Sequence, residues 1–199
     1  MIALLRRYAS HLAIVLFVVL LLPPVQHVLT ASMTAQMLLQ IPLLILVGWL
    51  LRGALPQRFV SAISAWNYNG ITGLILATLT TAVWMLPRSL DAAATEPLMA
   101  TLKFLSVPLL IGLPLGISWP RMGFVLRGVF IAELISMFFR LGWLYMITPT
   151  RLCTNYLVGD QQRSGQYMML IGGAIFAWLA IKLLWGRFDS LSDDQHKST

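Results

Sequence analysis

The sequence carries its sulfur donors in methionine rather than in cysteine, with ten methionines and one cysteine among 199 residues. A thioether is a soft, uncharged ligand that selects Cu(I) over Zn²⁺ or Mg²⁺. Met33 and Met37 lie four residues apart and would share one face of a helix. The candidate copper ligands are five methionines and one histidine, namely Met33, Met37, Met85, Met99, Met168 and His27. The alternative is that the methionines fill irregular gaps between helices and that His27 is an interfacial polar residue.

A second candidate group is polar and consists of Asp91 and the run Asp160-Gln161-Gln162. Either aspartate could orient a metal ligand or hold a partner protein. The alternative for Asp160 is a place at a helix N-terminus, where its charge suits the helix dipole. The two roles are compatible.

Glu133 and Arg140 are the ionisable residues deepest in an apolar run. Charged groups at bilayer depth cost roughly 2.5–3.5 kcal/mol each and usually pair or face a cavity. Seven residues are about two helical turns, so both side chains point to one side of a helix, separated by ~10 Å of rise. We therefore expect a partner on another helix, or a water, instead of a direct contact. A polar pathway through the bundle is the alternative to structural pairing.

The sequence contains no motif for a disulfide, for catalysis or for nucleic-acid binding. Cys153 is single, so it forms no disulfide within the chain, and we expect it to be buried and inert. The sequence has no Ser-His-Asp set, no HExxH motif and no phosphate-binding glycine loop, which predicts that the protein is not an enzyme. Its net charge of +7 comes from scattered arginines and lysines without a recognition motif, which excludes a nucleic-acid partner.

The elements that must position these residues are membrane helices. Hydrophobic residues make up 58% of the chain, charged residues only 11%, and the mean hydropathy is +0.80, so the lipid bilayer is the expected surrounding. The prediction is an all-α polytopic membrane protein with one bundle of six transmembrane helices in residues 1–188 and a disordered cytoplasmic tail in 189–199. Apolar windows of about 19 residues place the helices near 12–28, 33–51, 70–86, 98–117, 124–147 and 167–185.

Lysines and arginines set the expected orientation. They concentrate at one set of helix ends, which places both termini in the cytoplasm and loops 23–32, 84–106 and 148–166 outside. The first span, which follows Arg6-Arg7, could instead be a signal peptide, although no clear cleavage motif follows it. In the outer loop 84–106 we expect Pro87 to end one helix, and Thr95 to cap the next one at Pro97.

The outer loops also carry a resemblance to a known family. The matching residues are Trp84, Leu86-Pro87, Asp91-Ala92-Ala93, Leu102, Leu105-Ser106, then Asp160-Gln161-Gln162, Gly165, Met168 and Gly172-Gly173, with a weaker match in QMLLQIPLLILVG from Gln36 to Gly48. This pattern resembles the CtaG family of cytochrome c oxidase assembly factors and covers roughly a third of the chain. Where that family has histidine, this chain has Met37, Met85 and Met99, and Lys103-Phe104 replaces a glutamate-histidine pair.

The resemblance implies a membrane assembly factor of the cytochrome c oxidase assembly or copper-handling type in a bacterial inner membrane. Its cofactor would be Cu(I), and its partner a membrane oxidase. The alternative is a non-catalytic accessory subunit or scaffold of another membrane protein complex, which has lost metal binding together with the histidines. A permease that uses Glu133 and Arg140 is weaker, because nothing indicates inverted repeats.

Overall fold

The computed structural model describes residues 2–153 and 155–196, with side chains described at 8–56, 58–153 and 155–184. This part of the chain is helical and contains no strand. The elements are α1 (Ile2–Leu21), α2 (Pro23–Thr30), α3 (Met33–Ala35), η1 (Gln36–Gln40), α4 (Ile41–Leu51), α5 (Gln57–Trp66), η2 (Tyr68–Gly70), α6 (Ile71–Trp84), α7 (Pro87–Thr95), α8 (Pro97–Ser106), η3 (Val107–Gly112), α9 (Leu113–Ser118), α10 (Phe124–Ile147) and α11 (Val158–His196).

Three continuous helices are long and apolar enough to cross a membrane, and two bent pairs raise the number to five if each pair is one span. The continuous helices are Met33–Leu51, Pro97–Ser118 and Val158–Leu184, which match three of the six expected spans. The remaining expected span, the fifth along the chain, coincides with α10, which has the expected ends but carries charged side chains and is not among these candidates. The structure thus supports a membrane protein, while the count of six spans is not confirmed.

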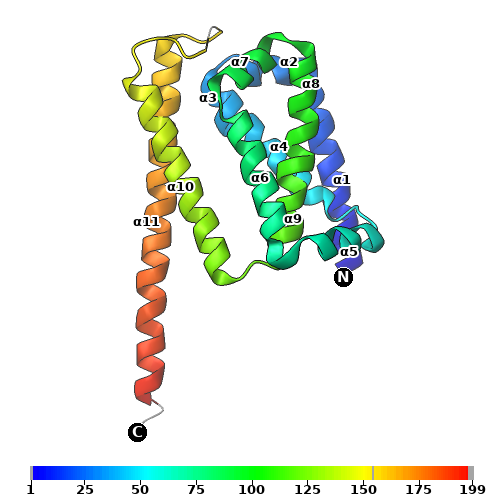
Figure 1. Ribbon diagram of the computed structural model, residues 1–199, viewed down its shortest axis with the longest axis vertical. Helices are drawn as coiled ribbons and strands as arrows, with labels where there is room; N and C mark the ends of the chain where they lie inside the picture. The colour runs from blue at the N-terminus through cyan, green and yellow to red at the C-terminus, as the bar shows by residue number, and fades with distance from the viewer. Residues whose placement is uncertain (1, 154, 197–199) are drawn as a thin grey trace.

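Both bends occur where a residue precedes a proline. The helix axis turns by 72° between Tyr8–Leu21 and Pro23–Thr30, and by 69° between Tyr68–Trp84 and Pro87–Thr95. Leu22 and Leu86 adopt extended backbone angles, because the ring of the following proline disfavours the helical conformation. Each bend turns the chain into a short helix at the same end of the molecule (Figure 1).

Two details of the 84–106 segment correct the expectation from sequence. The segment holds a helix, α7, in place of a short turn. Thr95 does not cap the following helix, because it is the last residue of α7 and its hydroxyl donates back to the carbonyl of Asp91 at 3.3 Å. Glu96 occupies the N-cap position instead, and α8 begins at Pro97 as expected.

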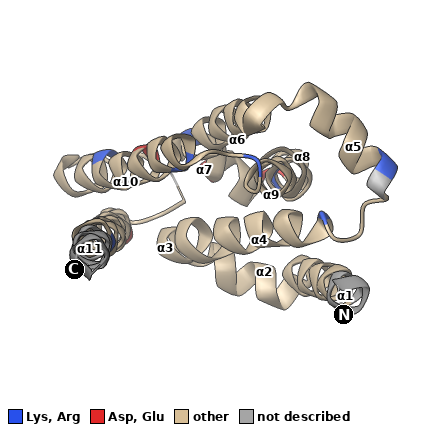
Figure 2. Ribbon diagram, turned by 90° about the horizontal axis from the view of Figure 1, so that it is seen from below, with Lys and Arg blue, Asp and Glu red and all other residues tan. Residues whose placement is uncertain are grey.

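The helices form two groups. In the first, α1, α4, α6 and α8 with η3 and α9 lie side by side, while α10 and α11 form an antiparallel hairpin along one flank (Figures 1 and 2). Small residues allow the closest approaches. A Cβ at Gly112 would lie 2.3 Å from the Ile45 carbonyl oxygen, and one at Gly165 would lie 2.7 Å from the Gly142 oxygen. Each group therefore has a crossing that only glycine permits.

Two short π-helical turns interrupt the long helices. η1 and η3 lie in the middle of Met33–Leu51 and Pro97–Ser118, respectively. Such turns are rare and often mark functional sites. η1 contains Gln36, Met37 and Gln40, all buried.

The C-terminal helix is longer than expected. α11 begins at Val158 and continues to His196, through most of the segment for which the sequence predicts a disordered tail. No glycine or proline follows Gly186 to stop the helix, and extending an existing helix is easier than starting one. Residues 197–199 of that tail lie outside the described part.

Candidate functional site

One cavity lies between the first helix group and α10. Its volume is about 460 Å³, within the range of small-molecule sites. Its lining comes from η1 and α4, α6, η3 and α9, α10, and one residue of α11. Most of the lining is apolar, and the polar exceptions are Thr78, Thr81, Glu133 and Arg140.

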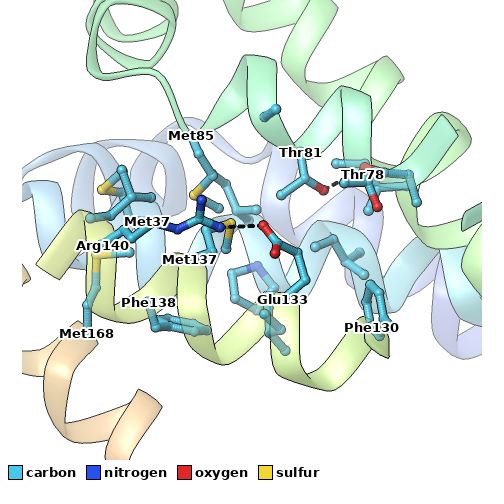
Figure 3. Close-up of a pocket in the computed structure, with 18 of the residues that line it drawn as sticks. Met37, Thr78, Thr81, Met85, Phe130, Glu133, Met137, Phe138, Arg140 and Met168 are labelled. Atoms are coloured by element: carbon cyan, nitrogen blue, oxygen red, sulfur yellow. Dashed lines mark hydrogen bonds and ion pairs between the residues drawn. The ribbon is translucent and has the colours of Figure 1, made fainter. Parts of the chain in front are cut away.

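Four methionines from four different elements line this cavity. Met37 comes from η1, Met85 from the end of α6, Met137 from α10 and Met168 from α11. Their side chains gather around the same space, next to the ion pair (Figure 3). The Ser164 hydroxyl lies 3.9 Å from the Met37 sulfur and holds that side chain. Three expected ligands, Met37, Met85 and Met168, are thus brought together.

The other expected ligands lie elsewhere. Met33 is buried in the core, and Met99 is partly buried against that core. His27 is exposed on α2. None of these three lines the cavity. Among the described residues, no group of three or more His, Cys, Asp or Glu could hold a metal ion.

Glu133 and Arg140 form a direct ion pair, which corrects the expectation of separate partners. The Arg140 Nη2 atom contacts the Glu133 Oε1 atom. Rise along the helix axis was the wrong measure, because the long arginine side chain extends toward the helix N-terminus and covers the two turns. Both side chains are more than half exposed. The pair therefore forms a polar patch on a wall that is otherwise apolar.

A buried lysine, Lys103, contacts η1, which lines the cavity on the side of the first helix group. Lys103 is 1% exposed, and its Nζ donates to Gln40 Oε1 at 2.8 Å. In the described chain the ion pair of Glu133 and Arg140 is the one salt bridge found, so Lys103 has no carboxylate partner. Gln40 Nε2 has no hydrogen-bond partner. The Lys103 ammonium group and the Gln40 amide N–H groups are therefore buried together with no carboxylate as a partner.

Gln36, a second buried glutamine of η1, binds groups at the end of the molecule that carries α2 and α7. Its Nε2 donates to the Leu90 carbonyl at 3.3 Å. Its Oε1 accepts from the Tyr156 hydroxyl at 2.7 Å, and that hydroxyl also lies 2.9 Å from the Thr30 carbonyl oxygen. Burial, followed by Cys153, Asp91 and Asp160, raises the pKa of Tyr156 to about 12, so the hydroxyl remains a donor at neutral pH. The contacts tie α2, η1, α7 and the 148–157 loop together.

Asp91 joins the 84–106 segment to the 148–157 loop. Its Oδ1 accepts from the Asn155 backbone N–H at 3.0 Å and from Asn155 Nδ2 at 2.9 Å. Cys153 is buried beside it and donates to the Pro87 carbonyl at 3.4 Å. Burial, and then the Asp91 carboxylate, raises the pKa of the Cys153 thiol to about 11. The thiol is therefore protonated at neutral pH and a poor nucleophile.

The second motif serves the start of α11. Asp160 lies in the first turn of that helix, as its charge predicts. Gln161 is 2% exposed; its Oε1 accepts from the Leu152 N–H at 3.0 Å, and its Nε2 lies 3.4 Å from the Tyr145 carbonyl oxygen. Gln162 is exposed. Asp91 contacts Asn155, five residues before this run.

Sequence reasoning missed several residues of the site. Met137 could have been found, because it lies four residues after Glu133 and so on the same face of α10. Tyr156 and Asn155 gave no signal, since a loop sequence does not show what the loop contacts. Comparison with protein families, with curated proteins and with solved structures found no match.

Proposed function

We propose that the protein is a six-span membrane protein of a bacterial inner membrane that binds Cu(I) in the methionine-lined cavity and assists the assembly of a copper-containing membrane oxidase. Both termini would be cytoplasmic. The observation that supports the proposal is the meeting of Met37, Met85, Met137 and Met168 around one cavity. Two of these positions, Met37 and Met85, stand where the resembling family has histidine.

The donor set suits Cu(I) better than other ions. Thioethers are soft and bind Cu(I) at any pH, whereas Zn²⁺ favours imidazole, thiolate and carboxylate ligands. The cavity wall is apolar apart from two threonines and a charge-neutral ion pair. Burying a monovalent ion there is less costly than burying a divalent one. The methionines would hold the ion, and the chemistry supplied is storage and transfer of copper without a change in its redox state.

The end of the molecule with α2, α7 and the 148–157 loop is the proposed contact surface for the client. Positive-inside reasoning places this end outside, where a copper site of an oxidase would be loaded. Exposed polar side chains at this end include Arg88, Glu96, Gln162 and Arg163. Asp91 and Gln161 would act by shaping this surface, because their side chains are bound to Asn155 and Leu152.

Copper retention by the purified full chain tests the proposal. The protein would be purified in mild detergent, loaded with Cu(I) under reducing conditions, desalted, and assayed for metal. We expect about one Cu(I) per chain in the parent, and markedly less in Met37→Leu and Met85→Leu, since leucine keeps the side-chain volume but removes the sulfur. Met122→Leu is the matched control, because Met122 is buried but does not line the cavity.

An accessory subunit is the second candidate function. It is favoured by the exposed Glu133 and Arg140 pair, since charged groups in a membrane usually face protein or a cavity. Copper absent from the parent, or retained equally by all three variants, would refute the copper proposal. In that case the wall of α10 would be the surface that a partner helix covers.

A further inference from the structure

α5, which follows α4 in the chain and leads into α6, lies across the bundle axis at the end opposite α2 and α7 (Figures 1 and 2). Its residues Phe59, Ile63 and Trp66 follow the i, i+4, i+7 spacing of one helix face. They are 61%, 42% and 86% exposed. A short helix with aromatic and aliphatic side chains on one face, next to membrane spans, suits the boundary between lipid tails and headgroups.

Side-chain hydrogen bonds hold α5 in this position. Asn67, at the end of α5, accepts from the Gly73 N–H at 3.0 Å and donates to the Ser118 hydroxyl at 2.7 Å. Arg121 donates to the Ser64 carbonyl at 3.0 Å, and the Thr72 hydroxyl donates to the Trp66 carbonyl at 3.0 Å. α5 is thus fixed to α6 and α9, and any groove beneath it is formed before a ligand arrives.

A groove of about 500 Å³ lies between α5, α6 and the η3–α9 segment. The α5 wall contributes Ala62, Ile63 and Trp66 with Asn67 at its end, while the other walls contribute Thr72, Gly73, Leu76, Leu109, Leu113, Pro114 and Ile117. This lining is almost entirely apolar, so it suits a hydrocarbon chain better than a polar metabolite. The groove does not share residues with the methionine-lined cavity.

A basic residue of α5, Arg58, lies one helical turn beyond the residues that line the groove. Arg58, Ala62 and Trp66 are spaced four residues apart, so they form one row along α5 and Arg58 extends the lining row by one turn. Arg52 and Arg121 donate to the carbonyls of Gly116 and Ser64. Arg58 has no hydrogen bond or ion pair from its side chain in the described residues. The sequence has no acidic residue before Asp91 to neutralise it.

We propose that this groove binds one acyl chain of an anionic phospholipid and that the Arg58 guanidinium binds the phosphate. The apolar walls match the chain, and the unpaired cation matches the charge of the headgroup. Arginine binds phosphate through paired N–H groups. The binding site is separate from the methionines and does not depend on copper.

Native mass spectrometry of the detergent-purified full chain tests the proposal, with phosphatidylglycerol and phosphatidylcholine of identical acyl chains as probes. We expect the parent to retain one phosphatidylglycerol in preference to phosphatidylcholine by about fivefold, the effect of one basic residue at an anionic lipid surface. Arg58→Gln should abolish the preference without loss of folding, because Arg58 is exposed. Arg88→Gln, an exposed arginine on α7 at the opposite end, is the control and should keep it.

Ala62→Trp tests the role of the groove independently of the charge of Arg58. Ala62 is exposed and lines the groove, so tryptophan there fills the space and should reduce retention of both lipids. An unchanged preference in Arg58→Gln would overturn the assignment of the phosphate contact. Equal retention of both lipids by the parent would overturn the proposal that the site selects an anionic headgroup. Retention in Ala62→Trp as in the parent would show that the bound lipid is not in this groove.

Discussion

Replacing Gln40 should be far more damaging than replacing Lys103, although the two form one hydrogen bond. Gln40→Leu leaves the buried Lys103 amine with no partner, and removing one partner of a buried charged group costs about 3–5 kcal/mol. Lys103→Met leaves only the neutral Gln40 amide unpaired, at about 1–3 kcal/mol, and relieves the burial of a basic group. The double variant replaces both groups by apolar ones and should be close to the parent.

Thermal unfolding in detergent measures this asymmetry, with a thiol-reactive fluorogenic dye that labels Cys153 once unfolding exposes it. At ~2–4 °C per kcal/mol for a chain of this size, Gln40→Leu should lower Tm by ~6–20 °C. Lys103→Met should lower it by less, and adding Lys103→Met to Gln40→Leu should restore most of the loss. Equal shifts in the two single variants, or a double variant less stable than either, would refute the reasoning that an unpaired lysine causes the damage.

Three further results are expected from the contacts described above. Gly112→Ala should destabilise the bundle, because its Cβ would lie 2.3 Å from the Ile45 carbonyl oxygen, whereas Gly173→Ala, which meets nothing within 4 Å, should leave Tm unchanged. Tyr156→Phe should cost about 1–3 kcal/mol, since Gln36 Oε1 loses its donor in a buried position; thermal unfolding measures both. A Cys153 pKa of about 11, up from 9.0, predicts alkylation at pH 8 about 100-fold slower than in the unfolded chain. The unfolded chain loses this proton first, so stability should fall from pH 9 to pH 11.

Helix positions were predictable where local signals agree with the apolar pattern. The 33–51 and 124–147 helices have the expected ends: the Ser32 side chain caps one by accepting from Ala35 N–H at 3.1 Å, and extended Gly123 precedes the other. Pro87 was recognised as the end of a helix, but Pro23 was not, because the expected 12–28 span runs through it, whereas the helix axis bends by 72° there. The short helix α7 after Pro87 was not expected either, although a proline restricts only the residue before it.

The site was predictable only in part, for two physical reasons. Helical spacing tells which side chains share a face, so Met37 could be nominated, but it does not tell which helices face each other. Side-chain length is the second reason, because Arg140 spans two turns that a backbone estimate of ~10 Å keeps apart. Lys103 is a charged residue in the core, and its position could not be predicted because it depends on the hydrogen bond to Gln40 from another helix.

The two glycine contacts determine how the cavity can change its width. Gly112 locks α4 against η3, and Gly165 locks α10 against α11, so neither crossing can slide without a backbone clash. The methionine-lined cavity lies between these two helix groups, with Met37 and Met85 on one and Met137 and Met168 on the other. A tilt of the α10–α11 hairpin about the connection at 119–123 would move Met137 and Met168 together away from Met37 and Met85. It would have to break the contacts of Tyr156 with Gln36 and of Ser164 with Met37. A ligand bound in the cavity under the proposed function would then enter and leave through the side of the bundle, by this one movement.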